Sequence, residues 1–243
     1  MPEQTIDWLK KHSPQLSVGI MSANIMRLED DIQALEENNV NMLHFDVMDG
    51  HFVPPLTIGP AFVKAAKTTL LKDVHLMISN PLEKIQEYVA AGADLITVHV
   101  ESCVHAHRAL QQTRDMKNAN DANRGIVRGI ALNPGTPLSS IEELIDEVDI
   151  VFLVAVNPGF PAQKFIESMK TKIEKLKIMI REVQKHPLIG LDGGITRLNI
   201  AEIAAMGADV IVTGSAIFDG KQPAENIAFM HNALKKKQEP HGK

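Results

Sequence analysis

Residues 41–54 read NMLHFDVMDGHFVP. The apolar beginning of this stretch predicts a short strand ending at His44 and Asp46, and side chains two residues apart on a strand share one face. An imidazole and a carboxylate therefore project into the same space. Elsewhere, one apolar run leads into His75 and another ends at Asp192. Two His and two Asp from three strand ends are a suitable ligand set for a divalent metal ion.

Apolar, β-branched runs alternate with amphipathic helical patterns along the whole chain. We expect helices that include residues 28–37, 82–91, 141–147 and 165–183. Strict alternation of strand and helix implies parallel strands with crossover helices. Eight units in 243 residues favour a closed (β/α)8 TIM barrel over an open doubly wound sheet. The eight expected strands cover residues 17–21, 42–46, 73–77, 95–100, 125–131, 150–156, 188–191 and 210–212.

No linker or low-complexity stretch divides the chain. We therefore expect one (β/α)8 catalytic domain over residues 15–238, preceded by a short N-terminal helical arm over residues 1–14. Residues 239–243 are expected to form a polar tail, and the three lysines at 235–237 to be a solvated helix end.

Composition excludes several classes of function. The net charge is −5 and the 25 basic residues form no long run, so we expect no nucleic-acid partner. Cys103 is the only cysteine, which fits a reducing compartment and a passive, small side chain. The first residues lack the pattern of a signal peptide, and the longest apolar runs are too short to span a bilayer. We expect a cytoplasmic protein without a membrane partner.

Polar residues gather at the carboxyl ends of the expected strands, which is the face where barrel enzymes carry their active sites. His99 and Glu101 follow the fourth strand and are expected to support the pocket from behind. Asp49 is expected to cap a turn. The other polar residues at strand ends are His44 and Asp46, His75, Asn133, Asn157 and Asp192.

Glycines at the last two strand ends indicate a phosphate site. Gly193 and Gly194 follow the seventh strand, while Gly214 and Ser215 follow the eighth. Backbone N–H groups can approach an anion closely at such glycines and at a short helix start. The loop at 157–163, which includes Gly159 and Phe160, is long enough to fold over a ligand.

Six motifs in order resemble the ribulose-phosphate 3-epimerase family, and the matches run from about residue 17 to 220. They are HFDVMDGHFVP at 44–54, HLM at 75–77, LNPGTP at 132–137, NPGF at 157–160, DGGI at 192–195 and GSAIF at 214–218. The resemblance implies a metal-dependent barrel enzyme that interconverts ribulose 5-phosphate and xylulose 5-phosphate, and a homo-oligomer.

The resemblance also implies roles for individual residues. The metal ligands would be His44, Asp46, His75 and Asp192, with Asp46 and Asp192 also serving as the acid–base pair. The substrate would be contacted by Met48, His75, Met77, Gly159, Phe160, Gly193, Gly194, Gly214 and Ser215, and at further positions by Gly19, Pro161 and Ala162.

The chemistry can be argued from the residues themselves. Inverting a carbon next to a ketone requires a proton to leave one face and another to arrive on the opposite face, which two carboxylates can perform. The intermediate is an enediolate, and a divalent metal ion stabilises its negative charge as a Lewis acid. A set of two His and two Asp suits Zn²⁺, Mn²⁺, Fe²⁺ or Co²⁺.

Three departures from the family pattern all fall on expected substrate contacts. Gly19 stands where the family usually has Ser, and Val154 stands where Met is common. Pro161 and Ala162 replace two glycines, and Pro161 has no backbone N–H to offer a phosphate. The reaction is therefore predicted more firmly than the sugar.

Three alternatives remain open. The same reaction on another ketose phosphate, such as a hexulose 6-phosphate, needs only a different substrate fit. A non-catalytic paralogue that binds sugar phosphate would be expected to lose the metal ligands, which this chain keeps. An aldolase or decarboxylase would more naturally carry Lys at the end of an inner strand, and none of the expected strands ends in Lys.

Overall fold

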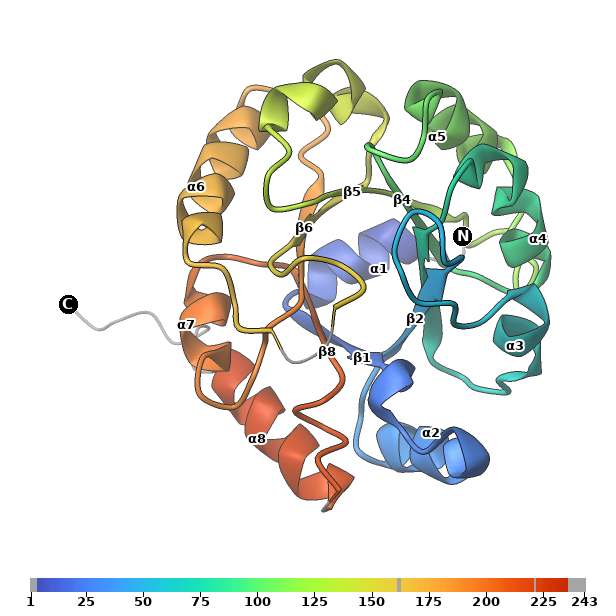
Figure 1. Ribbon diagram of the computed structural model, residues 1–243, viewed down its shortest axis with the longest axis vertical. Coiled ribbons are helices and arrows are strands. Elements are labelled where there is room, and N and C mark those ends of the chain that lie inside the picture. Colours follow the sequence, from blue (N-terminus) through green and yellow to red (C-terminus); the bar gives the residue numbers. More distant parts are fainter. Residues whose placement is uncertain (1–3, 161–162, 221, 236–243) are drawn as a thin grey trace.

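The computed structural model describes residues 4–160, 163–220 and 222–235. Its centre is a closed barrel in which each strand pairs in parallel with the next and β8 pairs with β1 (Figure 1), so the predicted (β/α)8 fold is confirmed. The strands are β1 (Gln15–Gly19), β2 (Met42–Met48), β3 (Leu71–Met77), β4 (Leu95–His99), β5 (Val127–Leu132), β6 (Ile150–Val154), β7 (Leu188–Asp192) and β8 (Val210–Thr213).

Helices surround the strands in Figure 1, and α1 lies inside the outline of that ring. Three-residue 3₁₀-helices occupy Ile20–Ser22, Ile25–Arg27 and Pro81–Glu83. A ten-residue 3₁₀-helix occupies Leu138–Glu147, so the helix expected over 141–147 is a 3₁₀-helix. The α-helices are α1 (Thr5–His12), α2 (Leu28–Glu37), α3 (Pro60–Ala65), α4 (Ile85–Ala90), α5 (Ala106–Asp115), α6 (Ser168–Arg181), α7 (Ile200–Ala205) and α8 (Pro223–Lys235).

The first strand lies two residues earlier than the sequence predicts. Gln15 already pairs with Val210 of β8, and Ile20 belongs to the following 3₁₀-helix instead of the strand. Strand pairing uses backbone groups, so a polar Gln can begin a ladder. Ile20 is apolar because it is buried in the core, not because it is in the sheet. Hydrophobicity alone therefore placed this strand wrongly.

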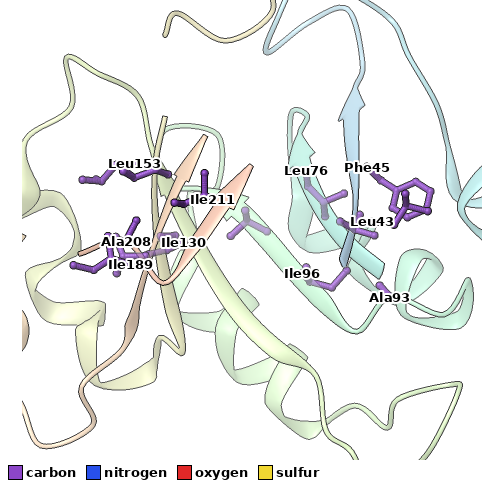
Figure 2. Close-up of a cluster of buried hydrophobic side chains, with 14 of the residues drawn as sticks. Leu43, Phe45, Leu76, Ala93, Ile96, Ile130, Leu153, Ile189, Ala208 and Ile211 are labelled. Carbon is purple, nitrogen blue, oxygen red and sulfur yellow. The ribbon is translucent and has the colours of Figure 1, made fainter. Parts of the chain in front are cut away.

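Alternation along the strands creates two apolar layers. One set of side chains faces the helices, and Figure 2 shows part of it, including Leu43 and Phe45 of β2 and Ile211 of β8. Because successive strand side chains point to opposite faces, His44 and Asp46 must then point into the barrel. The outward layer thus fixes which residues can form an internal site.

Apolar side chains fill the amino-terminal end of the barrel interior. Leu9 of α1 is fully buried in this cluster, and Ile6 and Trp8 pack against it. The predicted N-terminal arm is therefore a helix that closes the amino-terminal end of the barrel, which we call the lower end. The strand residues of this cluster include Met42, Leu71, Leu95, Val127, Ile150, Leu188 and Val210.

Other sequence predictions have mixed outcomes. Cys103 is buried and unpaired, as expected of a passive small side chain. Lys235 ends α8, but the two lysines after it and the expected tail at 239–243 lie outside the described residues. No helix in the described part of the chain is long and apolar enough to cross a membrane.

Candidate active site and metal centre

Four predicted residues meet at the carboxyl end of the barrel. His44 and Asp46 come from β2, His75 from β3, and Asp192 from the end of β7. Each offers one ligand atom, and these four atoms all lie within 4.8 Å of one another. Since β2 and β7 are three places apart around the ring, the two carboxylates approach from well-separated strands.

The buried carboxylate of Asp73 holds the ring of His44 in place. Its Nδ1 lies 2.7 Å from Asp73 Oδ2, and the Ser17 hydroxyl donates to the same oxygen at 2.8 Å. The other ring nitrogen, Nε2, lies 3.3 Å from Asp46 Oδ1. Burial lowers the pKa of His44, but Asp73 and Asp46 outweigh it and raise that pKa well above its ordinary value. Burial also raises the pKa of Asp46, but His44 and His75 hold it well below its usual range.

His75 points its Nδ1 between the two proposed acid–base residues. Nδ1 lies 3.4 Å from Asp192 Oδ2 and 3.7 Å from Asp46 Oδ1, and it is buried without a hydrogen-bond partner among the described residues. Burial lowers the pKa of His75, but the nearby carboxylates of Asp192 and Asp46 raise it overall. A buried nitrogen with nothing to bind is unusual in a folded protein.

These contacts fit a bound cation. Atoms that ligate one ion at about 2.0–2.2 Å lie about 3–4 Å from each other, so the observed set needs only a small contraction. The unpartnered His75 Nδ1 faces this set of ligand atoms. This group of His and Asp residues could therefore hold a metal ion.

His99 and Glu101 lie behind His75, as the sequence suggests. His99 Nε2 is 2.9 Å from His75 Nε2, and His99 Nδ1 is 3.0 Å from Glu101 Oε2. Burial raises the pKa of Glu101, but hydrogen bonds from His99, Thr136 and the Asn133 amide outweigh it and lower the pKa to about 2. Glu101 is therefore an ionised acceptor at neutral pH.

A pocket of about 210 Å³ adjoins the two carboxylates. Six predicted substrate-binding residues line it: Gly19, Phe160, Gly193, Gly194, Gly214 and Ser215. Four others, Met48, His75, Met77 and Gly159, are not part of its wall, while Pro161 and Ala162 lie outside the described residues. The wall also contains residues that the sequence analysis did not single out, namely Met21, Ser22, Val156, Ile195, Thr196, Val212 and Thr213.

Met48 and Met77 lie two residues beyond the ligand set, toward the carboxyl ends of their strands. They are register partners on β2 and β3, two residues beyond the partnered Asp46 and His75. Val154, where the family commonly has Met, is buried inside the barrel and packs in the same cluster as Phe152. Val154 therefore replaces the family's Met in the interior layer of the barrel, because position 154 is not part of the pocket wall.

Glycine is needed at the pocket because backbones approach closely there. A Cβ on Gly214 would lie 2.5 Å from the Gly19 carbonyl oxygen. Gly194 has φ +69°, and a Cβ there would lie 2.4 Å from the backbone nitrogen of Phe165. At Gly19, by contrast, a Cβ would meet its nearest atoms at 3.7 and 3.8 Å, so a Cβ fits there at ordinary contact distances.

The loop after β6 leans on the loop after β2. Gly159 has φ +85°, and a Cβ there would lie 2.9 Å from Val53 and within 3.1 Å of Pro54 and Pro55. The Gln163 side chain closes the β6 loop on itself, accepting from the Asn157 amide at 3.0 Å and donating to the Phe160 carbonyl at 2.8 Å. Gly159 thus packs the two loops together instead of lining the pocket.

Asp49 caps the turn after β2, as expected. Its Oδ1 accepts from the backbone N–H groups of His51 and Phe52, both at 2.9 Å. Its other oxygen accepts from the Ser79 amide at 2.7 Å, which ties the loops after β2 and β3 together.

A larger cavity, of about 510 Å³, lies at the opposite end of the barrel. Its wall includes His12, Asn41 and His231 but none of the strand-end ligand set. We place the chemistry at the smaller pocket because only that pocket includes Asp46 and Asp192.

Comparison with known proteins identifies the family. The profile of the ribulose-phosphate 3 epimerase family matches residues 15–218, which include every strand of the barrel. The chain belongs to the ribulose-phosphate 3-epimerase family. The match covers all four residues of the ligand set and the glycines of the pocket. The chain is therefore an isomerase, an epimerase that acts on carbohydrates.

Curated relatives agree with this family. A chloroplastic ribulose-5-phosphate-3-epimerase from Arabidopsis thaliana is 42% identical over 226 residues, which cover 91% of this chain and 78% of the relative. A ribulose-phosphate 3-epimerase from Bacillus subtilis (strain 168) is 41% identical over 207 residues, covering 84% of this chain and 92% of the relative.

Solved structures share the barrel at much lower identity. KGPDC from Streptococcus mutans has a TM-score of 0.67 at 14% identity, covering 94% of this chain and 100% of that chain. 3-Hexulose-6-phosphate synthase from Salmonella typhimurium has a TM-score of 0.61 at 20% identity, covering 92% and 100%. At these identities the likeness concerns the fold alone.

Proposed function

We propose that this chain inverts C3 of ribulose 5-phosphate to give xylulose 5-phosphate. The observation that carries the proposal is the meeting of Asp46 and Asp192, from β2 and β7, beside two imidazoles and a glycine-lined pocket. The curated relatives are named for the same reaction. The family match includes the whole ligand set, so the residues that the chemistry needs are present.

The cation is the first part of the proposal. His44, Asp46, His75 and Asp192 would hold one divalent ion of Zn, Mn, Fe or Co. When bound, the ion supplies Lewis-acid stabilisation of the negative charge that develops on the substrate. The buried His75 Nδ1 supports this assignment, because it has no hydrogen-bond partner among the described residues and lies within the cluster of ligand atoms.

The proton transfers are the second part. One of the two carboxylates, Asp46 or Asp192, removes the C3 proton from one face of the ketose, and the electron pair left behind forms the enediolate. The other, in its protonated form, delivers a proton to the opposite face, so the product differs only in its configuration at C3. The origin of Asp46 and Asp192 on strands three places apart supports opposite placement.

Binding the phosphate is the third part. The backbone N–H groups of Gly193, Gly194, Gly214 and Ser215 would hold it, since all four residues line the pocket. The register of Met48 and Met77, two residues beyond Asp46 and His75, supports an apolar thioether layer next to the ligand set that helps keep water from the enediolate.

Deuterium exchange at C3 tests the proposal directly. The metal-loaded protein is incubated in deuterated water with ribulose 5-phosphate, xylulose 5-phosphate and a panel of other ketose phosphates that includes hexulose 6-phosphates. We expect interconversion of the two pentulose phosphates with deuterium incorporated at C3. Turnover confined to a hexulose 6-phosphate would change the assigned sugar and keep the assigned reaction.

The same panel distinguishes a non-catalytic paralogue. Such a protein would bind a ketose phosphate, measured by calorimetry, without incorporating deuterium into any of them. This outcome would reject the proposed reaction. Metal content is measured on every sample, so a failure to exchange is not confused with a loss of the ion.

A further inference from the structure

A row of hydrogen-bonding groups runs from the ligand set to the rim of the barrel. His75 Nδ1 faces the ligand set, and His75 Nε2 lies 2.9 Å from His99 Nε2. His99 Nδ1 in turn lies 3.0 Å from Glu101 Oε2. His75 and His99 are both almost completely buried, so bulk solvent does not reach their rings.

The two rings are nearly parallel and meet through their Nε2 atoms. Their planes differ by only 12°, and their centroids are 4.9 Å apart. Rings stacked face to face keep their atoms at least about 3.4 Å apart, near the contact distance between carbon atoms. The two nitrogens are only 2.9 Å apart, which is too close for face-to-face stacking, so they share a hydrogen bond. Such a bond needs one N–H and one bare nitrogen.

The groups at the two ends of the row decide which nitrogen donates and which accepts in each hydrogen bond. A metal ligand needs a bare Nδ1 on His75, which places the His75 proton on Nε2. His99 Nε2 must then accept, and the His99 proton must lie on Nδ1, where it donates to the Glu101 carboxylate. Each hydrogen bond then carries one proton, and neither imidazole needs a charge.

We propose that His99 and Glu101 are positioning residues that hold His75 in the tautomer whose Nδ1 is bare toward the metal centre. The inference rests on the proposed metal centre and adds two residues to it that bind neither metal nor substrate. Carboxylate–histidine–metal arrangements are common, and outer partners raise metal affinity by fixing the ligand. Here a second imidazole stands between the carboxylate and the ligand.

Glu101 is held in place from its far side. Its Oε1 accepts the backbone N–H of Asn133 at 2.7 Å, at the start of the loop after β5. Lys172 of α6 donates to the Asn133 carbonyl at 2.8 Å and so fixes the same residue. Phe52 packs on His99 with ring centroids 5.0 Å apart. The row therefore cannot rearrange without moving two loops.

Replacing Glu101 by Gln tests the direction of the row at constant size. The Gln oxygen is expected to keep the Asn133 N–H, which leaves its amide NH₂ facing His99 Nδ1. His99 must then carry its proton on Nε2, and His75 is driven to carry its proton on Nδ1. We expect Glu101→Gln to weaken Zn²⁺ binding by about 10- to 100-fold, measured by competition with a chelator.

A matched pair at His99 separates hydrogen bonding from packing. His99→Gln keeps an acceptor for His75 and a donor for Glu101, and we expect Zn²⁺ affinity within a few-fold of the wild type. His99→Phe fills the space without either group, and we expect a loss similar to that of Glu101→Gln. Glu142→Gln, on the exposed surface, is the control for the loss of one carboxylate.

A spectroscopic signature accompanies the affinities. In the Zn²⁺-loaded protein, long-range ¹H–¹⁵N spectra should show His99 protonated on Nδ1 and bare on Nε2. A structural histidine that only fills space would not change a ligand's tautomer. Thermal unfolding of the metal-free variants reports whether they fold, and Glu101→Gln carries the test even where His99→Phe does not fold.

The outcomes are separable from those of the proposed function. If the wild type fails to bind one Zn²⁺ per chain, the metal centre itself is wrong. If the wild type binds Zn²⁺ and Glu101→Gln binds it equally well, the positioning proposal is wrong while the epimerase proposal stands. Protonation of His99 on Nε2 in the wild type, or a His99→Gln variant as weak as His99→Phe, would also overturn the positioning proposal.

Discussion

The two ends of the barrel are built from the same strands and differ completely in chemistry. At the lower end, Leu71 of β3 lies in an apolar cluster that Leu9 of α1 closes. Four residues further along the same strand, His75 lies among carboxylates and another imidazole. Between them, Asp73 is fully buried and accepts from Ser17 and His44.

Stability and reactivity therefore occupy separate layers of the barrel. The lower layer buries apolar surface, which favours folding. The upper layer concentrates ionisable groups, which cost free energy to bury and are retained where they have a function. Substitutions at the upper end should therefore mainly change activity, and substitutions at the lower end should mainly change stability.

The largest effect is expected at the upper end. Asp192→Asn removes one proposed proton carrier but keeps an oxygen toward the metal centre, so we expect turnover to fall by at least about 10³-fold with little loss of thermal stability. Steady-state kinetics at matched metal content provides the measurement. Asp115→Asn, at an exposed position on α5, is the control. Wild-type turnover in Asp192→Asn would remove Asp192 from the mechanism.

The converse effect is expected at the lower end. Leu9→Ala removes a fully buried side chain that closes the barrel, so the free energy of unfolding should fall by about 2–5 kcal/mol. We expect kcat of the remaining folded protein to be unchanged. Denaturant unfolding measures the loss, and Leu198→Ala, which is 98% exposed, is the matched control. An equal loss of unfolding free energy in the two variants would show that packing Leu9 of α1 into the barrel does not stabilise it.

The upper end should also depend on pH through its metal affinity. Neighbouring carboxylates raise the pKa values of His44 and His75, so in the metal-free protein these imidazoles keep their protons to higher pH. Because binding must displace those protons, apparent affinity should fall as pH decreases below the raised pKa values, by about tenfold per pH unit for each imidazole. Proton release on binding Zn²⁺, measured calorimetrically in several buffers, checks this.

Asp73→Asn is the control for that pH dependence. Both hydrogen bonds to Asp73 use Oδ2, and Oδ1 has no partner among the described residues, so an Asn can keep its oxygen where it is needed. Loss of the charge should move the fall in affinity to lower pH. Affinity that is independent of pH in the wild type would contradict the predicted protonation of His44 and His75.

The smallest effect is expected at the edge of the pocket. Gly19→Ser adds a hydroxyl where the family usually has one, and the structure has room for its Cβ. One new hydrogen bond to substrate is worth about 1 kcal/mol, which should lower KM for ribulose 5-phosphate about fivefold. Combining it with Pro161→Gly restores a further backbone donor. Unchanged or poorer kcat/KM would mark these departures as adaptation to another sugar phosphate.

Much of the fold is encoded in local patterns that can be read without a structure. The alternation of apolar strands with helices predicted the barrel, and α2 occupies residues 28–37 as predicted. The end of β1 was misplaced because Ile20 is apolar for packing in the core and not for strand pairing. The N-terminal helix was expected, but its closure of the barrel was not, because periodicity does not show what a helix packs against.

The site also has features that the sequence predicts and features that it does not. His44, Asp46, His75 and Asp192 meet because strand ends of a barrel converge, and this is a property that sequence order reveals. The contact of Gly159 with Val53 and the lining by Ser22 depend on the paths of loops, which have no periodic signal. The nitrogen that each His turns toward the site likewise depends on ring orientation, which a sequence does not specify.

The central claim is that two carboxylates act on opposite faces of C3, and the most direct test is exchange without inversion. Asp46→Asn and Asp192→Asn, each with its Mn²⁺ content verified by elemental analysis, are incubated in deuterated water with ribulose 5-phosphate and xylulose 5-phosphate separately. Each variant keeps one carboxylate, so we predict deuterium at C3 of one epimer with Asp46→Asn, of the other epimer with Asp192→Asn, and no interconversion by either. Exchange of the same epimer by both variants, or interconversion at the wild-type rate by either, would contradict the two-carboxylate mechanism.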